Sequence, residues 1–257
     1  MNAPPQSVVP GAFSVVVVIP VFNHGQAIGR MVAGVRAQQL PGLLVDDGSE
    51  PGCAAILANL AAAEDGQVRL IRLPSNQGKG AAVIAGLREA GRLGYTHAVQ
   101  IDADGQHQVN DIAGFVAEAR AFPDAVIIGT PAFDRSVPRG RLVGRYLTHL
   151  WVWINTLSFA IGDSMCGFRV YPLPPILALL DTVQIGRRMD FDIEILVRLH
   201  WRGLKIRNRR TPVIYPPDGV SHFSFWRDNL SISRLHTKLF FGMLWRLPLL
   251  LWRKLRA

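Results

Sequence analysis

The stretch Phe13-Ser-Val-Val-Val-Val-Ile-Pro20 decides the fold class of this chain. A continuous run of β-branched residues is typical of a strand buried on both faces of a parallel sheet, and we expect Pro20 to end it. Outward from this run, strand and helix patterns alternate, which predicts an α/β fold with a mostly parallel sheet flanked by helices. Further strands are expected over 43–45, 68–73, 98–101 and 125–128, and helices over 27–38, 53–63, 80–91 and 111–121.

The second half of the chain follows a less regular pattern. Pro131 and Pro138 predict a loop after the strand at 125–128. Apolar periodicity then predicts a helix over 141–159, a strand over 165–171, a helix over 191–201 and a basic strand over 205–214.

Composition indicates a folded protein with an anionic partner. The 257 residues are 49% hydrophobic and 18% charged, which supports a packed core and argues against disorder. Residues 1–194 hold 15 Lys and Arg against 17 Asp and Glu, whereas residues 195–257 hold 13 against 2. A segment with a net charge of +11 suits an anionic surface, either nucleic acid or the cytoplasmic lipid leaflet.

The chain shows no sign of export or of a zinc site. Residues 1–13 contain no Lys or Arg, unlike a signal peptide, and no run of about 18 apolar residues predicts a spanning helix. Cys53 and Cys166 have neither CxxC spacing nor a nearby pair of histidines. We interpret them as two reduced thiols of a cytoplasmic protein.

Polar clusters follow three of the expected strands directly. They are Pro20-Val-Phe-Asn23, Asp46-Asp47-Gly48 and Asp102-Ala-Asp104. In open α/β sheets, ligands bind at the carboxyl ends of the strands, so these clusters predict one shared site.

Asp102 and Asp104 form the candidate metal element. Two carboxylates two residues apart on a turn can converge on Mg²⁺ or Mn²⁺, and Gln106 can add a carbonyl ligand. The same short pattern also occurs as an ordinary solvated turn. Its position at a strand end favours the metal interpretation.

Six short motifs follow one another along the chain. They are Val18-Ile-Pro-Val-Phe-Asn23, Val45-Asp-Asp-Gly-Ser49, Asn76-Gln-Gly-Lys-Gly80, Asp102-Ala-Asp-Gly-Gln106, Cys166-Gly-Phe-Arg169 and Phe191-Asp-Ile-Glu194. In this order they resemble glycosyltransferase family 2, in its dolichol-phosphate mannosyltransferase-like branch. The resemblance runs from about Phe13 to Tyr215, and it implies the GT-A fold, a nucleotide-diphospho-sugar donor, a divalent cation and inversion at the anomeric carbon.

For the donor side, the resemblance implies roles residue by residue. Phe22 stands where the family usually has Tyr, and His24 where many members have Glu. Lys79, at the start of an expected helix, can reach a donor phosphate or lie on the surface as an ordinary lysine. The residues expected to bind the donor are Pro20, Phe22, Asn23, Val45, Asp47, Lys79, Asp102 and Ala103. Those expected to hold the metal are Asp102, Asp104 and Gln106, and Asp104 is also a predicted catalytic residue.

The acceptor side departs from the family pattern. Pro131 stands where relatives commonly carry Arg, and His222 lies where they often have a Ser-Lys element. Arginines at 135, 139, 141 and 145 are the candidates to replace those phosphate contacts. Arg169 is expected to pair with a phosphate or with Asp163, or to form a purely structural ion pair. The predicted acceptor residues are Arg139, Arg145, Asp163, Arg169 and His222.

Asp192 is the candidate general base. A hydroxyl acceptor must lose a proton, and Asp192 is predicted to take it. A lipid phosphate is already ionised, and Asp192 would then only position other groups. As a third alternative, it is a helix-start carboxylate that interacts with the helix dipole.

The end of the chain is expected to form a basic, aromatic, amphipathic helix. We divide the chain into a GT-A domain, 1–224, with a nucleotide-sugar half at 13–130 and an acceptor half at 131–224, and a tail, 225–257. The tail either packs on the domain or docks on anionic lipid, which predicts a cytoplasmic protein held at the inner face of the membrane, with no nucleic-acid partner.

The function predicted is a metal-dependent, inverting sugar transfer to a lipid-linked or membrane-proximal acceptor. Two alternatives remain at this point: a sugar-phosphate nucleotidyltransferase, which would release pyrophosphate, and a non-catalytic basic module that binds membrane or nucleic acid. An oxidoreductase is disfavoured because 13–34 contains no G-x-G-x-x-G.

Overall fold

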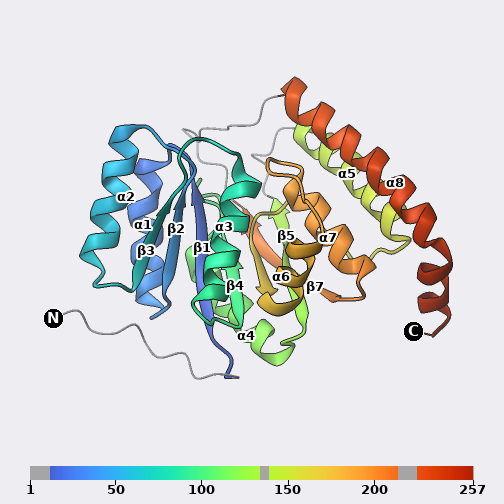
Figure 1. Ribbon diagram of the computed structural model, residues 1–257, viewed down its shortest axis with the longest axis horizontal. Coiled ribbons are helices and arrows are strands. Elements are labelled where there is room, and N and C mark those ends of the chain that lie inside the picture. The colour runs from blue at the N-terminus through green and yellow to red at the C-terminus, as the bar shows by residue number, and fades with distance from the viewer. Residues whose placement is uncertain (1–11, 134–138, 214–224, 257) are drawn as a thin grey trace.

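The computed structural model describes residues 12–133, 139–213 and 225–256. Its centre is a seven-stranded sheet with the order β3-β2-β1-β4-β6-β5-β7 (Figure 1). Only β6 runs antiparallel to its neighbours, so the predicted mostly parallel α/β fold is confirmed. The strands are β1 (Val15–Val21), β2 (Gly42–Asp46), β3 (Val68–Arg72), β4 (His97–Gln100), β5 (Ala125–Phe133), β6 (Arg169–Pro172) and β7 (Lys205–Val213).

Helices cover both faces of this sheet (Figure 1). Along β1, Val16 and Val18 pack into a cluster with α3, α6 and α7, whereas Val17 and Ile19 pack with α1 and α4 on the other face. The strand is therefore buried on both sides, as its unbroken apolar run predicts. The helices are α1 (Gly25–Ala37), α2 (Pro51–Ala63), α3 (Lys79–Arg92), α4 (Ile112–Ala121), α5 (Arg139–Thr156), α6 (Leu173–Thr182), α7 (Phe191–Trp201) and α8 (Phe225–Arg256), with a short 3-10 turn η1 (Val109–Asp111).

Pro20 does not end the first strand, so that prediction was wrong. The strand continues to Val21, and Pro20 pairs with Val45 of β2. In a parallel strand each residue directs its N–H and its C=O to the same side, and successive residues alternate between the two sides. The carbonyl of Val18 accepts the N–H of Ile101, so Val18 faces the β4 side. Pro20 faces the same side, but pairing with β4 ends at Val18. The missing N–H of Pro20 therefore removes no hydrogen bond between strands.

The same reason explains why Pro131 lies in a strand and not in the predicted loop. Gly129 donates its N–H to Phe168 on the β6 side of β5, and Pro131, two residues later, faces that side beyond the last β6 contact. On the other side β5 continues along β7, where Pro131 pairs with Thr211. The part of the predicted loop around Pro138 lies outside the described residues.

Two further elements differ from the sequence prediction. The strand expected over 165–171 is confined to β6, and the residues before it form a loop that enters the site. Helix α6 was not predicted, and it begins with the sequence Leu173-Pro174-Pro175. Both prolines lie in its first turn, where the backbone N–H groups have no helical partner to lose.

Helix α8 is 32 residues long and packs against α5 and α7. Its buried apolar residues are Ile232, Leu235, Leu239, Met243 and Leu250. The expected amphipathic C-terminal helix is thus confirmed, and it packs on the rest of the protein. Over the described parts of the chain, no helix is both long and apolar enough to cross a bilayer.

Gly86 tests the packing of α3 on the sheet. A Cβ at this position would lie 2.3 Å from Cγ1 of Val18 and 3.1 Å from Cγ2 of Val45. We expect Gly86→Ala to lower the free energy of unfolding in urea by about 1–3 kcal/mol, because overpacking here outweighs the better helix propensity of alanine.

Gly29→Ala in α1 is the matched control. A Cβ there would meet nothing within 4 Å, so the substitution should raise stability by about 0.5–1 kcal/mol. A stabilising effect of Gly86→Ala would contradict the packing described.

Candidate active site

The three polar clusters predicted at the strand ends meet at one edge of the sheet. The backbone N–H of Asp47 bonds to the carbonyl of Val21, and the N–H of Asn23 bonds to Oγ of Ser49. Asn23 has a φ of 57°, a left-handed conformation that asparagine tolerates, and its Oδ1 accepts the N–H of Glu50. The loops after β1 and β2 are therefore locked together beside the end of β4.

Asp47 shapes the turn that leads into α3. Its carboxylate accepts the N–H groups of Gln77 and Gly78 at 2.8 and 2.9 Å. Burial raises the pKa of Asp47, and the two N–H bonds oppose that rise. These bonds place Lys79, the next residue, at the end of β4, so Asp47 here supports the turn. Its predicted contact with a base is an expectation that no contact in the structure tests.

Two other predicted donor residues contribute no side chain to the site surface. Val45 is fully buried in the core beneath α3, and Ala103 is only 3% exposed. Any contact they make with a nucleotide has to come from the backbone. Pro20 is buried as well, whereas Phe22 and Asn23 are partly exposed.

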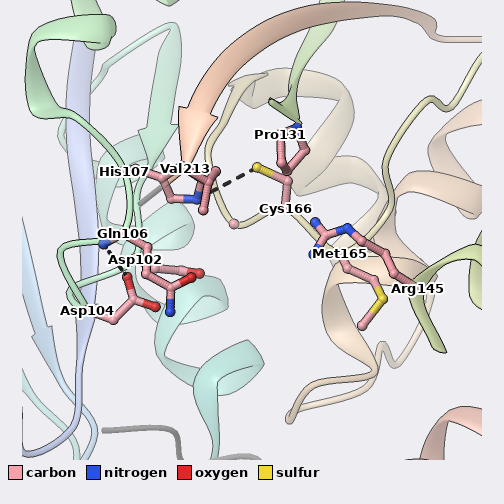
Figure 2. Close-up of a pocket in the computed structure, with 10 residues that line it drawn as sticks. Asp102, Asp104, Gln106, His107, Pro131, Arg145, Met165, Cys166 and Val213 are labelled. Atoms are coloured by element: carbon pink, nitrogen blue, oxygen red, sulfur yellow. Dashed lines mark hydrogen bonds between the residues drawn. The ribbon is translucent and has the colours of Figure 1, made fainter. Parts of the chain in front are cut away.

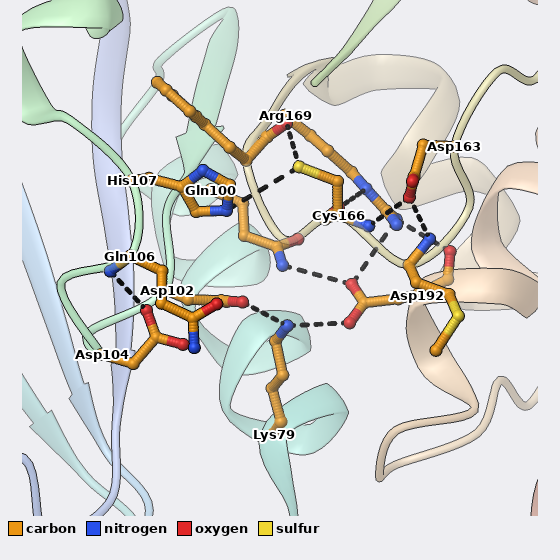
Figure 3. A network of polar contacts seen from close by, with 12 residues as sticks. Lys79, Gln100, Asp102, Asp104, Gln106, His107, Asp163, Cys166, Arg169 and Asp192 are labelled. Atoms are coloured by element: carbon orange, nitrogen blue, oxygen red, sulfur yellow. Dashed lines mark hydrogen bonds and ion pairs between the residues drawn. The ribbon is translucent and has the colours of Figure 1, made fainter. Parts of the chain in front are cut away.

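The centre of the site is an ion-pair network around Lys79 (Figure 3). Its Nζ lies 2.8 Å from Oδ2 of Asp102 and 2.8 Å from Oδ2 of Asp192. Desolvation alone would lower the pKa of Lys79, but the two carboxylates outweigh it and raise the pKa above its ordinary value. Lys79 is therefore a permanent cation that joins the β4 end to α7.

Arg169 holds the other side of Asp192. Its NH1 lies 3.5 Å from Oδ1 of Asp192 and donates to the main-chain oxygen of that residue at 2.9 Å. The guanidinium is fully buried and also bonds to the carbonyls of Ser164 and Cys166. Of the alternatives for Arg169, the structure shows the structural ion pair, and the suggested pairing with Asp163 is wrong.

Asp163 is paired with Arg145 instead. The Nε and NH2 atoms of Arg145 bond to the two carboxylate oxygens at 2.5 and 2.8 Å, and His149 lies 3.3 Å away. Burial would raise the pKa of Asp163, but the bonds from His149 and Arg145 hold it well below its usual range. Asp163 also accepts the N–H groups of Met165 and Cys166, so it orders the loop before β6.

A small pocket brings the metal element together with Arg145, one of the predicted acceptor residues, whereas Asp163 and Arg169 do not line it (Figure 2). Asp102, Asp104 and Gln106 line it on one side, and Arg145 and Cys166 on the other. Two of the predicted acceptor residues cannot be placed in it. The side chain of Arg139, at the start of α5, and the whole of His222 lie outside what the structure describes.

The two carboxylates of the metal element suit a divalent cation. Oδ1 of Asp102 is buried without a hydrogen-bond partner, and Oδ1 of Asp104 accepts the N–H of Gln106 at 3.0 Å. Burial and the charge of Asp102 both raise the pKa of Asp104, a repulsion that a cation would relieve. Burial would also raise the pKa of Asp102, but Lys79 outweighs it and lowers this pKa.

A cation here would need ligands from outside the protein. Within the described ranges, no group of three or more His, Cys, Asp or Glu side chains is arranged to hold a metal. Mg²⁺ typically takes one or two carboxylates and completes its shell with water and substrate phosphates. The pair Asp102 and Asp104 matches that pattern.

Gly167 allows the loop before β6 to touch the metal element. A Cβ on Gly167 would lie 2.0 Å from Oδ2 of Asp102. Glycine is therefore required for this close approach of backbone to carboxylate.

Sequence reasoning missed Gln100, Tyr171 and His149. Gln100 donates to Asp192 at 3.3 Å and accepts from the hydroxyl of Tyr171, which in turn accepts from Arg169. Gln100 carried a usable signal, because it is a lone polar residue inside an apolar strand. No local pattern marked Tyr171 or His149.

Comparison with known proteins gives this geometry a family context. Residues 16–176 match the family described as Glycosyl transferase family 2. An undecaprenyl-phosphate mannosyltransferase of Micrococcus luteus is 28% identical, over 75% of this chain and 80% of its own. A polyprenol monophosphomannose synthase of Mycolicibacterium smegmatis is 32% identical over 60% of each chain. An uncharacterised protein of Methanocaldococcus jannaschii is 26% identical over 81% of this chain and 92% of its own.

Solved structures share the fold. Glucosyl-3-phosphoglycerate synthase from Mycobacterium tuberculosis superposes with a TM-score of 0.61 at 16% identity, covering 90% of this chain and 80% of its own. A mannosyltransferase from Pyrobaculum calidifontis, solved with GDP-Man and Mn²⁺, gives a TM-score of 0.55 at 16% identity, covering 84% and 62%. The predicted GT-A fold is confirmed.

Arg169 tests the buried network. Arg169→Met is expected to lower the free energy of unfolding in urea by about 3–5 kcal/mol, because it leaves the buried carboxylate of Asp192 with one cation fewer. Arg169→Lys should not restore stability, since an ammonium cannot reproduce the forked set of bonds.

Arg92→Met provides the control. Arg92 forms an exposed ion pair with Glu89 within α3, and its loss should leave the free energy of unfolding close to that of the native protein. Similar effects of the two methionine substitutions would contradict the proposed importance of the buried guanidinium.

Proposed function

The chain belongs to glycosyl transferase family 2, in the dolichol-phosphate mannosyltransferase-like branch, and is a glycosyltransferase; from this premise we propose that it transfers a sugar from a nucleoside-diphospho-sugar to a polyprenyl-type lipid phosphate. This choice sets aside the two sequence-level alternatives, a nucleotidyltransferase and a non-catalytic module.

The state of Asp192 carries the choice of a phosphate acceptor. Its carboxylate is held by Lys79 and Arg169 and accepts a bond from Gln100. Both carboxylate oxygens of Asp192 therefore already accept from donors of the protein, and Asp192 is not among the residues that line the pocket. A hydroxyl acceptor requires a base, whereas a phosphate ester is already ionised at neutral pH. We therefore assign Asp192 a positioning role.

The names of the relatives support the same class of acceptor. The Micrococcus luteus relative is an undecaprenyl-phosphate mannosyltransferase, and a relative from Trichomonas vaginalis is a dolichyl-phosphate β-glucosyltransferase. Both names combine a lipid phosphate with a hexose. They differ in the sugar, so the donor is left to be identified by screening.

The proposed reaction is a single displacement. An oxygen of the acceptor phosphate attacks the anomeric carbon and forms a new C–O bond, while the bond from that carbon to the donor diphosphate breaks. The electron pair leaves with the nucleoside diphosphate. One in-line displacement inverts the configuration of the anomeric carbon.

Asp102 and Asp104 are the residues that would hold the divalent cation, with Gln106 as a further candidate. A bound Mg²⁺ or Mn²⁺ supplies Lewis-acid stabilisation of the negative charge that develops on the leaving diphosphate. Both carboxylates line the pocket, and the unpartnered Oδ1 of Asp102 supports their use as ligands.

Arg145 is the described arginine that we assign to the acceptor phosphate. It lines the same pocket as Asp102 and Asp104, and Asp163 fixes its guanidinium from behind through two bonds. A guanidinium held in this way presents a fixed positive charge to an incoming phosphate.

Transfer assays test the proposed reaction. Nucleoside-diphospho-sugars are screened with a short-chain polyprenyl phosphate and Mg²⁺ or Mn²⁺, and the expected products are a polyprenyl phosphate sugar of inverted configuration and nucleoside diphosphate. Asp104→Asn should lower the rate by about 100-fold or more, because the cation loses a charged ligand.

Asp65→Asn is the control, since Asp65 is an exposed turn residue far from the pocket. It should retain normal transfer. Release of pyrophosphate, or transfer only to hydroxyl acceptors with Asp192 indispensable, would contradict the proposal.

Lys79 provides a second test with a metal-binding readout. Because its ammonium neutralises Asp102, Lys79→Met should bind Mn²⁺ alone about tenfold more tightly than the native protein, as measured by electron paramagnetic resonance. Transfer should nevertheless slow, since Asp192 loses one of its two cations.

Lys205→Met is the matched control, because Lys205 is exposed at the start of β7. Its Mn²⁺ affinity should equal that of the native protein. Weaker Mn²⁺ binding by Lys79→Met would contradict a metal site at Asp102.

A further inference from the structure

The outward face of α8 is apolar over its C-terminal half. The positions at helical spacing that point away from the protein are occupied by Trp, Leu and Phe, and Trp245 and Leu255 are 85% and 88% exposed. Soluble proteins rarely leave so continuous an apolar surface in water. The exposed large apolar residues of this half are Phe241, Leu244, Trp245, Leu249, Leu251, Trp252 and Leu255.

Two arginines of the same segment are turned toward the protein. Arg246 lies over the ring of Trp201 at 4.7 Å and bonds to the carbonyl of Gly242, and Arg253 bonds to the carbonyl of Trp201 at 2.7 Å. An ordinary surface helix buries its apolar residues and turns its charges to water. Here Met243 and Leu250 are buried on the inward face, but Trp, Leu and Phe side chains also cover the outward face, so packing on the domain does not account for the whole helix.

Helix α5 extends this surface. Val143, Tyr146, Leu147 and Leu150 are exposed on it with the spacing of a single helix face. Trp151, next on that face, contacts the rings of His236 and Phe240 in α8. The two helices lie side by side at one edge of the molecule (Figure 1), so their exposed residues form one surface, which we call the α5–α8 face.

The charge of these two helices favours an anionic partner. Arg227, Arg234, Lys254 and Arg256 of α8 are exposed, while Asp228 is the single acidic residue of the two helices and is 3% exposed. A second copy of the chain would bring two such positive surfaces together, which is unfavourable. Anionic lipid complements the charge, and tryptophan and leucine at helical spacing suit the boundary between headgroups and acyl chains.

We propose that the α5–α8 face docks the enzyme on an anionic lipid bilayer, with α8 lying in the membrane surface. This inference rests on the proposed lipid-phosphate acceptor and adds the orientation of the enzyme. Helix α5 presents Tyr146 and Leu147 outward while the adjacent Arg145 lines the pocket. Docking through this face brings the pocket close to the headgroup level, where the phosphate of a lipid acceptor lies.

Vesicle flotation of the full chain tests the inference. The native protein should float with vesicles that contain phosphatidylglycerol, float less with pure phosphatidylcholine vesicles, and bind less as salt is raised. The double variant Trp245→Gln, Leu255→Gln should weaken binding by about tenfold or more, because both side chains leave water on docking. The double variant Leu147→Gln, Leu150→Gln tests α5 and should also weaken binding.

The control pair is Ile56→Gln with Phe122→Gln, two exposed apolar residues outside the α5–α8 face. It should bind vesicles as the native protein does. Equal vesicle binding by all variants would overturn the inference. So would a native protein that binds no vesicles and instead sediments as a dimer that the Trp245 and Leu255 substitutions dissociate.

A soluble acceptor separates this inference from the proposed function. With a short-chain polyprenyl phosphate in solution, the α8 double variant should transfer sugar at the native rate, and with acceptor embedded in vesicles it should be slowed about tenfold or more. Vesicle binding by a protein that transfers no sugar to any lipid phosphate would refute the proposed function alone. Normal transfer in vesicles by the double variant would refute the docking surface alone.

Discussion

The carboxylate of Asp192 is nearly withdrawn from water, and the arrangement of the site depends on how its charge is balanced. A buried carboxylate is costly unless cations and hydrogen bonds compensate it. Lys79 from α3 and Arg169 from β6 supply the two cations, and Lys79 also binds Asp102 at the end of β4. The ion pairs of Lys79 and Arg169 with Asp192 therefore connect the metal element to α7 and to the loop before β6.

The reversal of β6 makes this arrangement possible. Because β6 runs antiparallel to β4, its first residue lies at the edge of the sheet where β4 ends, and Gln100 pairs with Arg169. A parallel strand in the same place would begin at the opposite edge. The loop of Cys166 and Gly167 thus reaches Asp102 as a direct consequence of strand direction. Asp163 then holds Arg145 beside the same pocket.

Much of the fold followed from local patterns, and the exceptions have a common cause. The alternation of strand and helix, and the position of Asp47 and Asp102 just after strands, were read correctly because apolar periodicity and strand ends are local properties. Pro20 and Pro131 were misread because the cost of a proline depends on which neighbour its N–H faces and on where pairing with that neighbour stops. Those facts belong to the sheet as a whole.

The sequence by itself determined the α/β class, the edge of the sheet that carries the site, the two carboxylates suited to a cation, and the basic character of the C-terminal helix. Only the tertiary structure decided which charges meet. Lys79 and Asp192 are 113 residues apart, and Asp163 pairs with Arg145 in place of Arg169. It also decided that Arg246 and Arg253 face the protein while Trp245 and Leu255 face outward. The physical reason is that electrostatic and packing energies depend on distances and burial set by distant segments, which no local pattern of residues specifies.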